Sequence, residues 1–342
     1  MKHINILVNI LAFLLLLFTL TSCEVEFSPN AEWKETPVLY CMLDQDEDTT
    51  WVRVEKCYLG EGDIYSPSAI SDSINYPEGS LDIKLYAIRD NQFIDSIPFT
   101  YTLRDRDSGS FAYQQQPLYW AYTRHRLRED CFYRIVVRRS STGDTLVWSE
   151  TPLVVKNYDY NDIITYVNDN GKFGFYFNNA CLIKWRAMNN ARLYQPIIRF
   201  YYTVDEPSTP YEDTLYLDTP CALVHSRDNA LTYSTSYSRD AFLNALKEAL
   251  KDDPRSKGYP KIADIYLTVC TEDINAYINS VAAMTNLDQG RETYTNIHGG
   301  LGVFGARRTH IYKRVDCDPS DNPSSDHPGL NYLLQHLGVG FH

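Results

Sequence analysis

The chain lacks the short motifs that mark common enzyme classes. No H-E-x-x-H, G-x-S-x-G, S-x-x-K or P-loop pattern occurs, and these patterns carry the metal, nucleophile and phosphate chemistry of their families. Beyond the N-terminal segment, the histidines are isolated in the sequence: His125, His225, His298, His310, His327, His336 and His342. Distant residues can still assemble a catalytic triad in space. The missing motifs favour a protein that is not an enzyme, with a hydrolase as the enzymatic alternative.

Paired cysteines are also missing. Apart from Cys23, the cysteines form an odd, scattered set without a C-x-x-C pair: Cys41, Cys57, Cys131, Cys181, Cys221, Cys270 and Cys317. Most lie in apolar runs such as 38–43, and free cysteine behaves as a small buried hydrophobe. We expect core residues, with room for one disulfide in an oxidising compartment, and no zinc site.

Positive charge is scarce as well. The chain has 32 Lys and Arg against 44 Asp and Glu, which gives a net charge of −12. A nucleic-acid backbone would repel such a surface, so we expect no nucleic-acid partner. For the same reason, we expect no adsorption to an anionic lipid surface.

Only the N-terminus carries a long apolar run. Lys2 precedes an apolar stretch over 10–20, and the segment 20–23 ends at Cys23. This build resembles a bacterial lipoprotein signal with its lipobox, in which the cysteine thiol receives a diacylglycerol and becomes the first mature residue. The alternative, a membrane-spanning helix, needs about 20 apolar residues, whereas Asn5 and Asn9 interrupt this run. We therefore predict a signal peptide over 1–22, lipid attachment at Cys23 and a tether over 23–33.

Strand patterns dominate the rest of the chain. Hydrophobic residues alternate with polar ones over 81–88, 52–55 and 265–269, which is typical of half-buried strands. Turn residues separate the runs at Asp90-Asn91, 141–144 and 169–171. We predict helices at 239–251, capped by Ser238, and after Thr271, where Ile274, Ile278 and Val281 would face inward.

These patterns predict a mainly β protein. Residues 34–155 contain about seven short strands, which indicates an immunoglobulin-like β-sandwich. Residues 156–314 mix strands with the two helices and indicate a β-rich α+β domain. Residues 315–342 form an Asp/Pro/Ser-rich tail, within which Leu330, Leu334 and Leu337 are spaced to dock one or two helical turns.

Gly300, Gly302 and Gly305 match G-x-G-x-x-G without the context of a dinucleotide site. Such a site needs a helix after the glycines, and residues 306–312 alternate like a strand. We predict a glycine-rich strand that another backbone or a large side chain approaches closely. The acidic segments 44–48, 105–109 and 316–326 lack a complete calcium-ligand set and are expected to be surface loops. No cofactor is expected.

Tyrosine is unusually abundant, with 27 residues. Aromatic and basic residues are densest in one region: Phe111, Tyr113, Tyr119, Trp120, Tyr122, Arg124, His125 and Arg126. Flat aromatic rings with polar tips suit sugar rings and protein interfaces. Half-buried strands also favour tyrosine, so this region is either a binding patch or ordinary strand packing.

Two segments resemble an uncharacterised lipoprotein family of the Bacteroidota. The first is 37–44 with 51–56 and 59–62, and the second is the glycine-rich segment 296–306. The resemblance implies an envelope lipoprotein of unknown function, related to proteins often encoded beside TonB-dependent outer-membrane receptors, and it offers no catalytic residues. Glu24 and Glu26 resemble a surface-export signal, so we expect the protein on the outer membrane. It would face either the periplasm or the cell surface.

Together these features predict a lipid-anchored envelope protein that binds a ligand or a membrane receptor, possible partners including a TonB-dependent receptor. The alternatives are a structural or assembly protein of the outer membrane and, less favoured, an anchored hydrolase.

The lipid attachment is directly testable. The Cys23→Ala chain has no thiol at the attachment position, so mass spectrometry should detect lipid on the parent chain and none on the variant. Lipid that persists on the variant would contradict the assignment.

Overall fold

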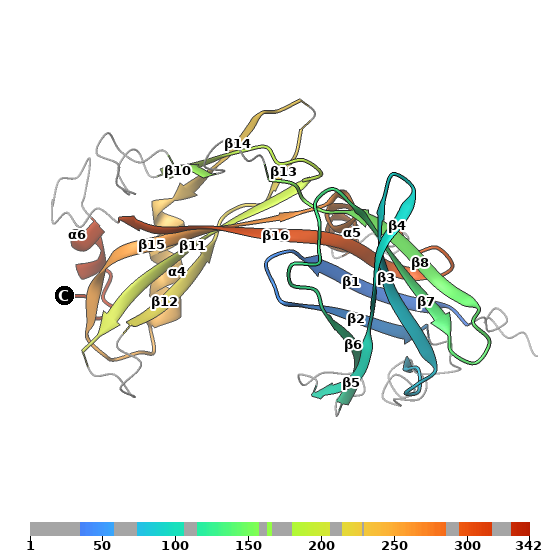
Figure 1. The fold of residues 1–342 in the computed structure, drawn as a ribbon. Coiled ribbons are helices and arrows are strands. Elements are labelled where there is room, and N and C mark those ends of the chain that lie inside the picture. The colour runs from blue at the N-terminus through green and yellow to red at the C-terminus, as the bar shows by residue number, and fades with distance from the viewer. Residues whose placement is uncertain are drawn as a thin grey trace, which may run out of the picture.

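The computed structural model describes residues 35–57, 74–105, 115–156, 163–165, 180–205, 214–227, 229–284, 294–316 and 330–342 (Figure 1). The signal peptide, Cys23 and the predicted turn at 169–171 lie outside these ranges. Strands dominate the described residues, which confirms the mainly β prediction. No helix in this described part is long and apolar enough to cross a membrane.

The first half of the chain is built from eight described strands. They are β1 (Pro37–Asp44), β2 (Thr49–Lys56), β3 (Leu81–Arg89), β4 (Gln92–Pro98), β5 (Thr100–Asp105), β6 (Gln115–Tyr122), β7 (Phe132–Arg139) and β8 (Thr145–Pro152). The alternations at 52–55 and 81–88 are confirmed as β2 and β3. Asp90 and Asn91 turn the chain between β3 and β4 with φ angles of 50° and 60°, as a tight two-residue hairpin requires.

These strands form two sheets that face each other. One contains β1-β2-β6-β5 and the other β4-β3-β7-β8. Inward side chains from both sheets form one apolar cluster, in which Leu39, Leu85 and Ile135 are fully buried. The first half is therefore β-sandwich-like, because each sheet hides one apolar face against the other.

The second half adds further strands and the helices. They are β9 (Ile163–Thr165), β10 (Ala180–Arg186), β11 (Leu193–Val204), β12 (Thr214–Pro220), β13 (Val224–His225), β14 (Thr232–Ser238), α4 (Arg239–Leu250), β15 (Lys257–Cys270), α5 (Glu272–Met284), β16 (Leu301–Asp316) and α6 (Leu330–Gln335). The strands β12-β11-β15-β16 continue the first sheet, while β14-β10-β9 form a separate one.

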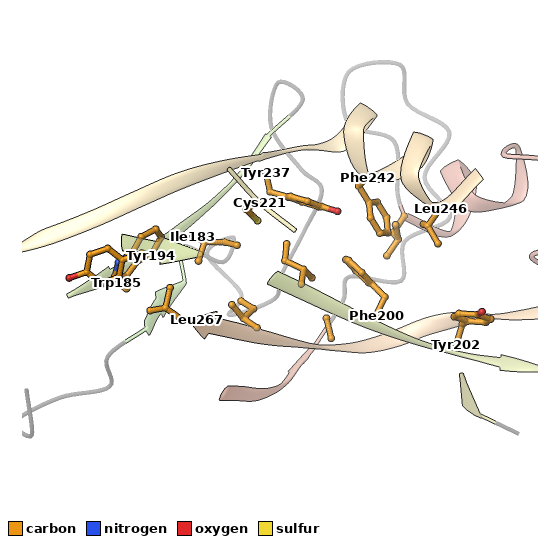
Figure 2. Packing of buried hydrophobic residues seen from close by; sticks show 14 of the residues in the cluster. Ile183, Trp185, Tyr194, Phe200, Tyr202, Cys221, Tyr237, Phe242, Leu246 and Leu267 are labelled. Atoms are coloured by element: carbon orange, nitrogen blue, oxygen red, sulfur yellow. The ribbon is translucent and has the colours of Figure 1, made fainter. Parts of the chain in front are cut away.

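Helix α4 covers the core of this half as the sequence predicts. The Ser238 hydroxyl accepts a hydrogen bond from the Ala241 amide at 3.3 Å and caps the helix. Figure 2 shows Phe242 and Leu246 pointing toward β11, where the ring of Phe200 lies 4.2 Å from that of Phe242, centroid to centroid. The amphipathic stripe thus closes the second apolar cluster.

Helix α5 begins directly after Thr271, as predicted, and packs on β16. Ile274 is buried, but Val281 is 39% exposed, so the predicted inward face is wrong at this position. The Thr271 hydroxyl is buried and accepts a hydrogen bond from the Ala306 amide at 3.1 Å. This threonine therefore ties the helix start to β16.

Strand β16 belongs to both halves of the protein. Residues 301–307 pair in parallel with β1, and residues 307–316 pair antiparallel with β15. In Figure 1 it is the long red ribbon that runs from one half to the other. The division into domains 34–155 and 156–314 stays a prediction. Strand β16, from the second range, pairs with a strand of each range.

The glycine-rich segment is confirmed as a strand under close approach. A Cβ at Gly300 would lie 2.4 Å from the Pro37 carbonyl oxygen, and one at Gly305 would lie 2.5 Å from Cγ1 of Ile274. Gly302 has a φ of +110°, which L side chains rarely adopt. Three glycines therefore let β1 and α5 pack on β16.

The C-terminal residues of the predicted tail close the second core. Leu330 and Leu334 are buried and Leu337 packs beside them, which confirms the predicted docking. Lys257 is fully buried, and its ammonium donates to three carbonyl oxygens, those of Asp253 (3.0 Å), Arg255 (2.7 Å) and Val339 (3.0 Å). These carbonyls replace the water that a buried cation loses. They join the C-terminal segment to the start of β15.

Gly302→Ala tests the contact between β16 and β1. A Cβ there would lie 2.0 Å from the Leu39 carbonyl oxygen, so we expect the free energy of unfolding to fall by at least about 3 kcal/mol. Gly143→Ala is the control, since its φ is +78° with no atom within 4 Å. It should cost about 1 kcal/mol in denaturant unfolding. Equal losses would refute the close approach.

Candidate functional site

The structure divides the predicted aromatic patch. Tyr119 is 2% exposed and lies in the sandwich core, whereas Trp120 and Tyr122 are 37% and 53% exposed. The cause is the strand itself, because successive residues of β6 point to opposite faces of the sheet. Phe111 and Tyr113 lie outside the described residues. The patch therefore reduces to Trp120 and Tyr122.

The basic residues of that prediction hold loops together. Arg124 pairs with Asp48 at 3.1 Å, and Arg126 pairs with Asp95 at 2.6 Å. His125 sits between them with a left-handed φ of 59°. These contacts link the β6–β7 loop to the β1–β2 loop and to the edge strand β4.

A second, half-buried tryptophan lies beside Trp120 and Tyr122. Trp51 of β2 lies directly opposite Trp120 in the β2–β6 register, and Thr49 lies opposite Tyr122. The guanidinium carbon of Arg104 stands 4.7 Å from the centre of the Trp51 ring. We call Trp51, Trp120 and Tyr122 the aromatic face. From the sequence, the inward alternation of Val52 and Val54 indicates that Trp51 points outward. It does not indicate that Trp120 lies opposite Trp51 on the neighbouring strand.

A groove of about 570 Å³ adjoins the aromatic face. Its lining, which we call the acidic groove, is Met42, Asp44, Glu47, Asp48, Thr49, Trp51 and Arg307. Asp44 accepts a hydrogen bond from Nε of Arg307 at 2.5 Å and another from the Asp46 amide at 3.0 Å. The predicted acidic loop 44–48 is thus one wall of a groove that Trp51 shares with the aromatic face.

The groove lies at one end of the sandwich. It contains Met42 and Asp44 from the end of β1, while Pro37 begins that strand. Eight residues of extended strand separate the two ends by about 25 Å. The groove therefore opens at the end opposite to the one at which the chain enters β1.

Carboxylates and indole rings suit two kinds of ligand group. Indole faces stack on sugar rings and attract cations, while carboxylates accept hydrogen bonds from hydroxyl and ammonium groups. Within the described ranges, no three Asp, Glu, His or Cys side chains gather to hold a metal ion. The arrangement is suited to non-covalent recognition.

Several tyrosines have a structural role that explains their abundance. The Tyr133 hydroxyl accepts from the Arg128 amide at 2.6 Å and donates to the Arg126 carbonyl at 3.2 Å. Tyr194 and Tyr233 pin preceding loops in the same manner. Burial raises the pKa of Tyr133 and of Tyr194 to about 12, which keeps both hydroxyls protonated. This fixing of loops by buried tyrosines accounts for part of the tyrosine excess.

Other predicted candidates are placed as follows. Cys41, Cys131, Cys221 and Cys270 are buried, which confirms them as core residues, while Cys57 is half-buried. His225 contacts Asn275 at 2.8 Å, His342 contacts Asp205 at 3.1 Å, and His298 stacks on Trp148. These three rings make structural contacts and give no support to the hydrolase hypothesis.

Comparison with known proteins leaves the function open. No protein-family model matches the chain, and no curated protein matches it either.

Tyr233→Phe tests the pinning of loops by tyrosine. The Tyr233 hydroxyl accepts from the Arg227 amide and donates to the Arg227 carbonyl, both at 3.1 Å. Its loss should lower the free energy of unfolding by about 1–2 kcal/mol in denaturant titrations. Tyr122→Phe, at an exposed ring, should change it by less than about 0.5 kcal/mol. A neutral Tyr233→Phe would show that the hydroxyl is dispensable.

Proposed function

We propose that this protein is a non-enzymatic, lipid-anchored envelope protein that binds a ligand through its aromatic face and acidic groove. The observation that carries the proposal is the pair Trp51 and Trp120, which lie in register on an outer sheet face beside a groove of about 570 Å³. Trp120 is 37% exposed and Trp51 is half-buried beside it, and adjacent aromatic rings on one outer face are typical of a binding surface. A flat ligand that stacks on these rings would bury the exposed part of Trp120.

The topology of the first half supports a binding scaffold. The sheets β1-β2-β6-β5 and β4-β3-β7-β8 follow the strand order of an immunoglobulin-like sandwich with one added edge strand. Tyr133 lies near the start of β7 and binds the backbone upstream, like the tyrosine corner of such domains. Sandwiches of this class present binding loops at their ends.

The charges indicate which ligands fit. The groove contains three carboxylates against the one guanidinium of Arg307, and the chain carries a net charge of −12, so the balance of charge disfavours an anionic ligand. A neutral saccharide can stack on Trp51 or Trp120 and donate its hydroxyls to Glu47 or Asp48. We therefore favour a neutral or amino sugar chain as the ligand.

The proposed location follows from the sequence and its resemblance. We propose that lipidation at Cys23 anchors the protein and that the family resemblance, with Glu24 and Glu26, assigns it to the outer membrane, where a TonB-dependent receptor is the proposed partner. Because the acidic groove opens at the end of β1 away from residue 35, it would face away from the bilayer.

The alternative function, in envelope assembly, is favoured by a different surface. Ile88 of β3 lies opposite both Phe93 of β4 and Phe132 of β7, so three apolar residues form one row. Phe93 and Phe132 are 65% and 57% exposed. An apolar row flanked by ion pairs such as Arg89–Asp130 is typical of a protein interface.

Substitutions on the two surfaces separate the functions. In the full-length protein in detergent, Trp120→Ala should weaken binding to a neutral or amino-sugar oligosaccharide at least tenfold in calorimetry. Phe93→Ala should leave saccharide binding unchanged, and both variants should retain the parent melting temperature within a few degrees.

Affinity capture from solubilised outer membranes provides the second measurement. Recovery of a receptor that depends on Trp120 supports the binding function, while recovery that depends only on Phe93 supports assembly. Absence of any saccharide binding together with capture insensitive to Trp120→Ala would end the proposal.

A further inference from the structure

A second cavity lies at the junction between the two halves of the protein. Its volume is about 720 Å³, within the range of small-ligand pockets. Loop residues before β11 and before β14, the first turn of α5 and Pro152 at the end of β8 line it. We call it the junction cavity. Leu153 belongs to the first apolar cluster and Val154 to the second, so the cavity sits where the cores meet.

Buried tyrosines hold the two loops of the junction cavity in place. The Met188 amide donates to the Tyr194 hydroxyl at 3.1 Å, and the Arg227 amide donates to the Tyr233 hydroxyl at 3.1 Å. The rings of Tyr194 and Tyr233 pack with their centroids 4.9 Å apart. One aromatic pair therefore fixes both loops, and a ligand would meet a preformed surface rather than order one.

Two asparagines in these loops adopt a backbone conformation that most residues avoid. Asn190 has a φ of 62° and Asn229 a φ of 61°. The side-chain Nδ2 of Asn190 donates to the Leu153 carbonyl at 2.8 Å, which fixes its loop to the end of the first half. Such constrained positions cluster at functional sites. The positive φ angles of Asn190 and Asn229 therefore agree with a preformed binding site at the junction cavity.

The lining of the junction cavity combines small apolar walls with a polar rim. Ala187, Met188 and Ala230 provide apolar surface, and Met adapts readily to different side chains. Asn189 and Asn229 are exposed at the rim. A primary amide both donates and accepts hydrogen bonds, which matches the two polar atoms of a peptide unit.

The rim also carries charges of both signs. Arg192 pairs with Glu272 at 3.1 Å, and Asp273 accepts a hydrogen bond from the Tyr294 hydroxyl at 2.7 Å. Arg227 lines the cavity from the other loop. Carboxylate and guanidinium groups on two sides of one cavity are complementary to a ligand that carries an amine at one end and a carboxylate at the other.

We propose that the junction cavity binds a short peptide of small or apolar residues with free termini. Asn189 and Asn229 bind its backbone, the alanines and Met188 receive a side chain, and Arg227 and Asp273 face its termini. A saccharide fits less well, because the tyrosines that line the cavity are 0% and 8% exposed and offer no ring face for stacking. This site is separate from the aromatic face and does not depend on the sugar-binding proposal.

Calorimetry on the full-length protein in detergent tests the site with a defined probe. The probe is a tripeptide of alanine, methionine and alanine with free termini, compared with a neutral trisaccharide. Asn189→Ala should weaken tripeptide binding about threefold to tenfold, as the loss of one hydrogen bond predicts. Ala230→Trp fills the cavity from a partly exposed loop position and should abolish binding. Asn244→Ala, at an exposed position of α4, should leave the affinity unchanged.

The outcomes separate this site from the aromatic face. Trp120→Ala should leave tripeptide affinity unchanged, whether or not it abolishes saccharide binding. Circular dichroism and the melting temperature show whether each variant is folded. If Ala230→Trp does not fold, the result for Asn189→Ala alone decides the test. No tripeptide binding to the parent, unchanged binding in Asn189→Ala, or trisaccharide binding that Asn189→Ala weakens would each overturn the proposal.

Discussion

The parallel contact between β16 and β1 is the interaction on which the rest of the structure depends. It joins a strand near the C-terminal end of the chain to the first described strand, and the same β16 then continues into the second half beside β15. The backbones approach closely only because Gly300 and Gly302 have no side chain. Without them, the Pro37 and Leu39 carbonyls would meet a Cβ, and the two halves would lose their common strand.

The acidic groove depends on this contact as well. Arg307, at the point where β16 passes from one partner strand to the other, reaches the carboxylate of Asp44 on β1. The ion pair fixes the wall of the groove beside Trp51. Most side chains of the acidic groove come from a short stretch of β1 and β2. Arg307 of β16, far away in the sequence, completes it.

Tyrosine has different roles on the two sides of the sheets. Tyr133, Tyr194 and Tyr233 are buried with their hydroxyls bonded to backbone groups of preceding loops, whereas Tyr122 is exposed on the aromatic face. A buried tyrosine combines a large apolar ring with one polar atom that needs a partner. That combination lets loops without regular hydrogen bonding keep a defined shape, as the two loops of the junction cavity do.

The sequence by itself determined the local elements: the alternation over 81–88, the Asp90-Asn91 turn, the Ser238 cap and the apolar stripe of α4. Each depends on neighbours within a few residues, which is why pattern and propensity suffice. The glycine-rich segment could be interpreted as a strand for the same reason. The tertiary structure alone decided that Trp51 faces Trp120, that Tyr119 leaves the aromatic patch, and that Lys257 meets Val339. Register and long-range pairing decide these contacts, and a one-residue shift of a strand would exchange its buried and exposed faces.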